Sequence, residues 1–223
     1  MKVRWIGGTL VVALVVTACS TTTNGHPVAK PPSYLALTRI VLQPGDFPAG
    51  WQPRPTPHAG DEDVQAQIAA CVGIRLRKSQ VIDRAASPDY GSGEFTAAST
   101  AASFKTQVEV RNRLAAVLSP KADPCLATAL RTSLVKVLPA DTKIENLTVR
   151  AVKGGPAANV AATVHAVITI TALGQTARVY SDTVFIGGVL FGAEIAFTGI
   201  GEPVPTDLQT RLTAAVVRRA TRA

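Results

Sequence analysis

Residues 176–198 read TARVYSDTVFIGGVLFGAEIAFT, and this stretch decides the fold of the chain. Two runs rich in β-branched and aromatic residues flank the pair Gly187-Gly188. The side chains on one face of the second run are all apolar: Val189, Phe191, Ala193, Ile195 and Phe197. A Gly-Gly pair between two such runs predicts a two-residue β-hairpin. The stretch therefore predicts the last two strands of an antiparallel sheet.

Two more strands are predicted before this hairpin, over 144–152 and 159–171. A glycine-containing turn follows each of them, so the four strands should form an antiparallel meander. A further strand is predicted over 94–105. Helical patterns occupy 61–73, 107–119, 123–138 and the segment after Pro205. The sequence therefore predicts an α+β fold: a curved antiparallel sheet of four to five strands, with helices packed on it and a C-terminal helix across the sheet.

The segment from Gln43 to Trp51 contains two prolines and two glycines, which predict turns. Phe47 and Trp51 are therefore aromatic residues held on a turn. They are the candidate ligand-binding residues, and the alternative is that they fold back and close the edge of the core. The pattern over 35–42 fits a short helix or a strand. Residues 75–89 show no regular pattern, and we predict them to be irregular or partly helical, followed by a glycine-rich turn over 90–94.

The N-terminus has the organisation of a secretory signal peptide. Lys2 and Arg4 precede an apolar run from Trp5 to Val16, and two small residues then precede Cys19. The apolar run is too short for a permanent transmembrane helix. Residues 19–33 are polar and proline-rich and predict a disordered tether. The alternative is an ordinary signal peptide in which Cys19 is accidental.

The sequence Val16-Thr17-Ala18-Cys19 resembles the lipobox of bacterial lipoproteins. The resemblance implies cleavage after Ala18 and attachment of a diacylglyceryl group to Cys19. It implies a signal peptide over 1–18, a lipidated tether over 19–33 and a single extracytoplasmic domain over 34–223. The protein would then be held by Cys19 on the extracytoplasmic face of the cell membrane.

Cys71 and Cys125 form an even pair once Cys19 is used for lipid attachment. An exported protein is in an oxidising compartment, so we predict a disulfide between them, with two buried free thiols as the alternative. Cys71 lies on the apolar stripe of its helix, which should point it into the core. Cys125 lies in the first turn of a helix that should begin with Asp123 as N-cap, followed by Pro124.

Sequence motifs for catalysis, metal binding and cofactor binding were not found. The three histidines, His26, His58 and His165, do not have metal-ligand spacing. We therefore expect no catalytic residue, no metal and no cofactor. Removing Lys2 and Arg4 from 23 basic residues leaves 21 against 15 acidic ones, a net charge of +6. This excess suggests attraction to anionic headgroups or envelope polymers, not to nucleic acid, or it serves solubility alone.

The order of elements also resembles that of exported actinobacterial lipoproteins of the mycobacterial type. Such proteins have an early D-[LF]-P-x-G-W turn, here Asp46 to Trp51, a cysteine on each of two helices, and a terminal meander with a helix. These domains are similar to the sensor-type extracellular domains of mycobacterial receptor kinases and to PsbP-type folds. Those sensor domains usually have two disulfides, and this chain can form one. The resemblance implies a non-enzymatic, membrane-anchored envelope lipoprotein that binds a lipid, glycan or protein partner. The alternative is a structural or accessory subunit of a membrane protein complex without a small ligand.

Overall fold

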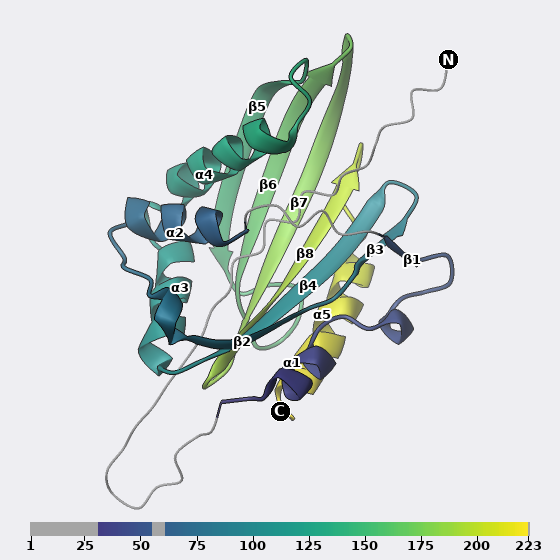
Figure 1. Cartoon of the computed structure of the whole chain (residues 1–223). Helices are drawn as coiled ribbons and strands as arrows, with labels where there is room; N and C mark the ends of the chain where they lie inside the picture. Colours follow the sequence, from purple (N-terminus) through teal and green to yellow (C-terminus); the bar gives the residue numbers. More distant parts are fainter. Residues whose placement is uncertain (1–30, 55–60, 223) are drawn as a thin grey trace, which may run out of the picture.

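The computed structural model describes residues 31–54 and 61–222 (Figure 1). The predicted signal peptide, the predicted lipidation site Cys19 and the tether up to residue 30 lie outside these residues. The helices are α1 (Tyr34–Ile40), α2 (Asp61–Cys71), α3 (Gln107–Val117), α4 (Ala122–Val137) and α5 (Thr206–Ala220), with short 3-10 turns η1 (Pro44–Asp46) and η2 (Lys78–Gln80). The strands are β1 (Gln52–Arg54), β2 (Val81–Ala86), β3 (Asp89–Ser92), β4 (Phe95–Phe104), β5 (Lys143–Lys153), β6 (Val160–Ala172), β7 (Gln175–Gly187) and β8 (Phe191–Ile200).

The strands form one eight-stranded sheet in the order β1-β3-β4-β8-β7-β6-β5. The strand β2 also pairs with β4: β3 pairs with the first residues of β4, and β2 pairs with its last residues. All of these strand pairs are antiparallel. The predicted meander of four strands and the strand before it are confirmed. The predicted number of four to five strands is wrong, because β1, β2 and β3 were expected to be loop, irregular chain and turn. These three strands have three, six and four residues, and their sequences do not show the clear alternation of apolar and polar side chains that predicts a strand.

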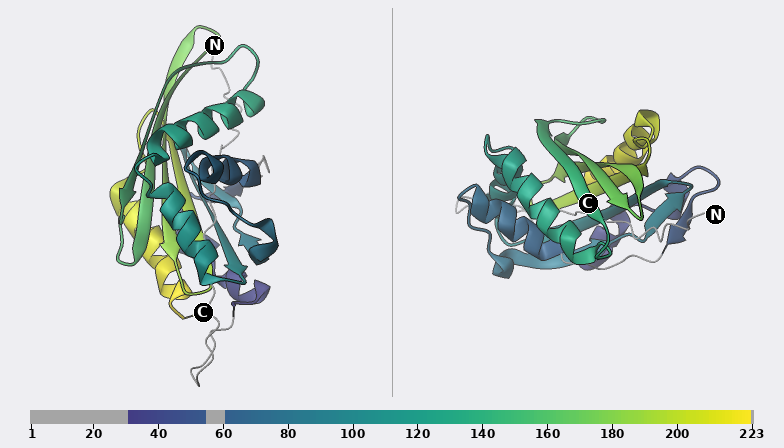
Figure 2. Two further views of the ribbon diagram at one scale, coloured as in Figure 1. Left: turned by 90° about the vertical axis from the view of Figure 1, so that its left-hand side faces the viewer. Right: turned by 90° about the horizontal axis from the view of Figure 1, so that it is seen from above.

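Helices cover both faces of the sheet, and Figure 2 (left panel) shows α3 and α4 on one side and α5 on the other. One core cluster joins α1 and α5 to the sheet through Leu37, Ile40, Ile195, Leu212 and Val216. On the opposite face, α2, α3 and α4 pack on the sheet through a second and a third cluster, which include Ile68, Val110, Leu126, Phe185, Leu130 and Ile168. The predicted C-terminal helix across the sheet is therefore confirmed. The strand β8 lies between these layers, and all of its residues except Ile200 are buried.

None of the helices within 31–54 and 61–222 is both long enough and apolar enough to cross a membrane.

A glycine cap ends α2, whereas the predicted N-cap of α4 is wrong. Gly73 has a φ of 80° and ends α2, where Gly73 donates to the Ala70 carbonyl and Ile74 donates to the Ala69 carbonyl. These two bonds form a Schellman motif, as a glycine cap requires. Asp123, however, is not the N-cap of α4, because that position is Lys121. The Asp123 carboxylate instead accepts a hydrogen bond from the Ala151 amide at 2.8 Å and so fixes α4 to β5.

The predicted disulfide between Cys71 and Cys125 is present, with 5.8 Å between the two Cα atoms. It joins the last residue of α2 to the first turn of α4. The predicted position of Cys71 in the core is wrong, because Cys71 is exposed while Cys125 is buried. The bond therefore fixes α2 to the second core cluster at the edge of that cluster.

Cys71→Ser and Cys125→Ser should each lower the free energy of unfolding by about 2 to 4 kcal/mol. The bridge closes a sequence separation of 54 residues, and its loss restores conformational entropy to the unfolded chain. The double variant should be no less stable than either single variant, because all three lack the same bond. Chemical denaturation of the purified proteins measures this, with thiol titration of the unreduced, denatured wild type as the control. Two reactive thiols in that control, or unchanged stability in both single variants, would contradict the prediction.

A buried ion pair lies between α3 and the sheet. Glu109 and Arg113 are 3% and 5% exposed, and the Arg113 Nη2 lies 3.2 Å from the Glu109 Oε1. The Arg113 guanidinium also lies over the Phe104 ring, 4.9 Å from its centroid. Burial lowers the pKa of Arg113 from its ordinary value, and the carboxylates of Glu109 and Glu194 act against this. Arginine nevertheless stays charged in proteins. Its buried positive charge therefore needs a buried carboxylate as a partner, and Glu109 provides one.

Candidate functional site: a hollow at the ends of strands β4 and β8

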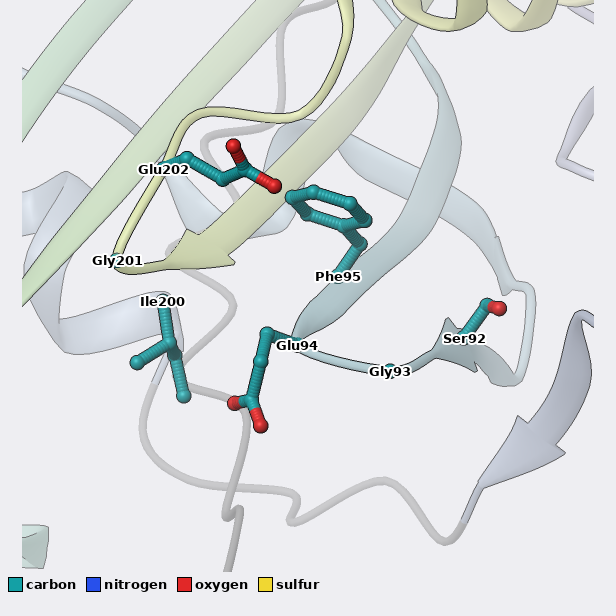
Figure 3. Close-up of a pocket in the computed structure, with 7 residues that line it drawn as sticks. All are labelled: Ser92, Gly93, Glu94, Phe95, Ile200, Gly201 and Glu202. Atoms are coloured by element: carbon teal, nitrogen blue, oxygen red, sulfur yellow. The ribbon is translucent and has the colours of Figure 1, made fainter.

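An open hollow of about 530 Å³ lies where β3 turns into β4 and where the chain leaves β8 (Figure 3). Two short segments line it. They contribute Ser92, Gly93, Glu94, Phe95, Ile200, Gly201 and Glu202. The two segments are distant in the sequence, and the pairing of β4 with β8 brings them together.

Two glycines form the turns that border the hollow. Gly93 and Gly201 have φ values of 57° and 84°, in the left-handed region that side chains other than glycine rarely adopt. Beside these turns the Ile200 amide donates to the Glu94 carbonyl at 3.2 Å, and the Gly201 amide donates to the Arg178 carbonyl at 2.8 Å. The sheet's hydrogen bonding thus continues past β8 and holds both turns in place.

Gly199 allows the chain to fold back beside the hollow. It pairs with Phe95 across the sheet. A Cβ on Gly199 would overlap the Glu202 carbonyl oxygen and would lie 3.2 Å from the Phe95 ring. Only glycine therefore leaves room for the Phe95 ring and the returning chain on this face of β8.

Glu94 and Glu202 give the hollow its charge. Both residues are exposed, and neither forms an ion pair within the part of the chain that the structure describes. Figure 3 shows the Glu202 carboxylate beside the Phe95 ring, whereas the Glu94 side chain is directed away from the ring and lies beside Ile200. A carboxylate beside an aromatic ring and another beside an aliphatic side chain suit a cationic group carried on an apolar frame. Among the described residues, His, Cys, Asp and Glu do not form a group of three that could hold a metal ion.

The predicted ligand-binding residues Phe47 and Trp51 lie near one end of the hollow. Their rings stack with centroids 5.0 Å apart. The Phe47 ring also packs against the Tyr90 ring, with 4.4 Å between the two centroids. Both are partly buried against the core cluster of α1 and α5. The turn comes close to the hollow at Gly50, where a Cβ would lie 3.8 Å from the Ser92 Oγ. The aromatic residues therefore cover an edge of the core, and their role in ligand binding stays a prediction.

Asp46, the first residue of the D-[LF]-P-x-G-W turn, has a structural role that the sequence analysis missed. The Arg219 guanidinium donates to its two carboxylate oxygens at 2.8 Å and 2.7 Å. Arg219 also donates to the Val41 carbonyl at 3.1 Å, and the Gln43 amide donates to Asp46 at 2.8 Å. This bidentate pair fixes the turn to α5. Local sequence gives no signal for it, because 173 positions separate the two residues.

Glu94 and Glu202 were not predicted from the sequence as site residues. Each acidic residue directly follows a turn glycine, in Gly93-Glu94 and Gly201-Glu202. This repeated Gly-Glu pair at strand ends was the signal available. It became meaningful only once β4 and β8 were known to be neighbours.

No protein-family model matches the sequence, and no curated protein sequence matches it. Among solved structures, the fold is similar to the crystal structure of the extracellular domain of PknH from Mycobacterium tuberculosis. The TM-score is 0.46 and the sequence identity is 12%, over 87% of this chain and 99% of that chain. The predicted resemblance to the sensor-type extracellular domains of mycobacterial kinases stays a prediction. The similarity is one of chain arrangement and carries no residue's role over to this chain.

Proposed function

We propose that this protein is an extracytoplasmic lipoprotein, held on the membrane by a lipid on Cys19, which acts by binding a partner and not by catalysis. The observation that carries the proposal is the disulfide between Cys71 and Cys125. Disulfides persist in oxidising compartments outside the cytoplasm. The lipobox-like sequence Val16-Thr17-Ala18-Cys19, near the N-terminus, supports the same location independently.

The hollow is the proposed binding site. The formal net charge of the chain is +8, so two carboxylates without an ion-pair partner among the described residues are unusual in this basic protein. We infer a ligand with a cationic group, such as an amine on a lipid, a glycan or a protein side chain. The Phe95 and Ile200 side chains would contact the apolar part of that ligand.

Native mass spectrometry of the protein purified from membranes in mild detergent tests the proposal. The expected result is a mature chain that begins at lipidated Cys19 and carries a bound cationic molecule. Recovery of a protein partner with an empty hollow would favour an accessory subunit instead. An N-terminus other than Cys19, without lipid, would contradict the proposed location.

The variant Glu94→Gln/Glu202→Gln should bind the recovered ligand about twofold to thirtyfold more weakly. Exposed ion pairs contribute about 0.2 to 1 kcal/mol each, and this variant removes two. The matched control is Asp141→Asn/Glu145→Gln, which removes two exposed carboxylates next to and within β5. Titration of each variant with the ligand measures the change. Equal weakening in both variants would show that net charge, and not the hollow, sets the affinity.

A further inference from the structure

The helix α1 exposes apolar side chains where it begins. Tyr34 and Leu35 are 54% and 69% exposed, although both are large and apolar. Leu35 and Arg39 are four residues apart, so they lie on the same face of the helix. Arg39 is also exposed. The buried face of α1, with Leu37 and Ile40, is directed into the core.

The C-terminal end of α5 lies beside α1. Arg219 donates hydrogen bonds from α5 to the Ile40 and Val41 carbonyls at the end of α1, and Figure 1 shows the two helices next to each other near the C-terminus. Arg218 and Arg222 are exposed and four residues apart. Exposed residues of α1 therefore lie near the end of α5 and near Arg222, which follows it. We name these residues the α1–α5 surface, which consists of Tyr34, Leu35, Arg39, Arg218 and Arg222.

The α1–α5 surface is positively charged. It contains three arginines, and the nearby Asp46 carboxylate is already engaged by Arg219. The sequence of α1 contains no acidic residue, and Asp207 is the one acidic residue of α5. Asp207 lies about eleven residues, or about 16 Å, along the helix from Arg218. The surface therefore offers three cations and two large apolar side chains together.

We propose that the α1–α5 surface lies on the anionic headgroups of the membrane that holds the lipid anchor. Arginine binds phosphate groups through its planar guanidinium, and each basic residue near an anionic bilayer adds a modest attraction. Tyrosine is favoured at the level of the headgroups. An exposed leucine is removed from water when it enters the boundary between headgroups and acyl chains, which favours membrane binding. Arginine, tyrosine and leucine side chains together therefore suit binding to an anionic membrane surface.

The position of the anchor supports this orientation. This step rests on the proposed function, because it uses the lipid on Cys19. About fourteen residues separate Cys19 from Ser33, which directly precedes α1. The sequence predicts a tether there, and a flexible tether of that length would have a root-mean-square extension of about 20 Å. The α1–α5 surface is thus the part of the fold that the anchor holds nearest the bilayer, so even a weak attraction is enough to orient the domain.

This orientation also determines where the hollow lies relative to the membrane. Gly201 and Glu202 lead into the N-terminal end of α5, whereas Arg218 and Arg222 lie at its C-terminal end. The fifteen residues of α5 span about 22 Å. With the α1–α5 surface on the membrane, the hollow is held away from the bilayer and remains open to a ligand from the other side.

Vesicle sedimentation of a chain of residues 20–223 tests the inference. This chain lacks Cys19 and the signal peptide but contains every described residue. It should bind vesicles of phosphatidylglycerol and phosphatidylcholine, and bind vesicles of phosphatidylcholine alone at least about tenfold more weakly. Binding should fall as salt is raised, because salt screens the attraction between arginine and headgroup.

The variant Arg39→Gln/Arg218→Gln/Arg222→Gln should lose at least about tenfold in binding to the anionic vesicles. Its matched control is Arg111→Gln/Arg131→Gln/Lys136→Gln, which removes three exposed charges from α3 and α4 on the opposite face of the sheet. The control should bind as the unmodified chain does. Tyr34→Ser/Leu35→Ser should also bind more weakly, although it keeps every charge.

Equal losses in the arginine variant and its control, or no binding to anionic vesicles, would overturn the inference. Unchanged binding by the Tyr34→Ser/Leu35→Ser variant would overturn the apolar part of it. Circular dichroism of each variant should match the unmodified chain, since all the replaced residues are exposed. Because the tested chain lacks Cys19, these outcomes are independent of whether Cys19 is lipidated.

Discussion

Replacement of Cys19 by serine should abolish lipid attachment completely, because serine cannot form the thioether. The chain should then be found as uncleaved precursor or as soluble protein. The expected effect is large, since each methylene of an acyl chain contributes about 0.8 kcal/mol to membrane binding and lipoproteins have two or three such chains. Incorporation of labelled palmitate, followed by separation of membrane and soluble fractions, measures both consequences.

Cys71→Ser is the matched control for this experiment. It replaces the same residue type but leaves Cys19 intact, so labelling should persist even though the fold is less stable. Unchanged palmitate incorporation in Cys19→Ser would exclude Cys19 as the lipidation site. The lipobox interpretation of Val16-Thr17-Ala18-Cys19 would then be wrong.

Arg113→Met should destabilise the domain by about 3 to 5 kcal/mol. Methionine fills much of the same space, but the Glu109 carboxylate loses its cation while being only 3% exposed. An uncompensated buried charge is far more costly than a buried pair. Chemical denaturation followed by circular dichroism measures the change in the free energy of unfolding.

Arg111→Met is the control for Arg113→Met. Arg111 lies on the same helix but is exposed and bonds to Gln107 at 2.9 Å, so its loss should change stability by no more than about 0.5 kcal/mol. The double variant Glu109→Gln/Arg113→Met should recover part of the loss, because it removes the stranded charge. Equal stability of Arg113→Met and Arg111→Met would show that the buried pair does not carry the expected energy.

The parts of the fold that the sequence predicted are those with strong local signals. The strands β5 to β8 have ten or more residues each, rich in β-branched residues, and glycines lie between them in the sequence. The disulfide was predictable because the cysteine count left two candidates. The strand β2 was missed because its six residues, Val81–Ala86, mix apolar and charged side chains. It is a strand because β4 offers it a partner, and its own composition did not predict this.

The hollow was not predictable for a different reason. Glu94 and Glu202 come together only through the pairing of Phe95 with Gly199, which a pattern within either segment cannot show. The aromatic turn shows the opposite case. Phe47 and Trp51 were conspicuous in the sequence, and in the structure they pack on the core. Aromatic residues on a turn were therefore a sign of packing against the core at least as much as of ligand binding.

The pairing of Asp46 with Arg219 also sets an order of events in folding. The N-terminal part of any chain is synthesised first, so the turn at Asp46 is made early and its partner is made with the last helix. Until then the apolar face of α1 has no helix α5 to pack on, and contacts over such sequence distances form slowly. The first helix of the domain thus gains its full set of contacts only when the last helix has been made. A chain cut short before Thr206 would leave Leu37 and Ile40 without α5, open to proteases and to aggregation.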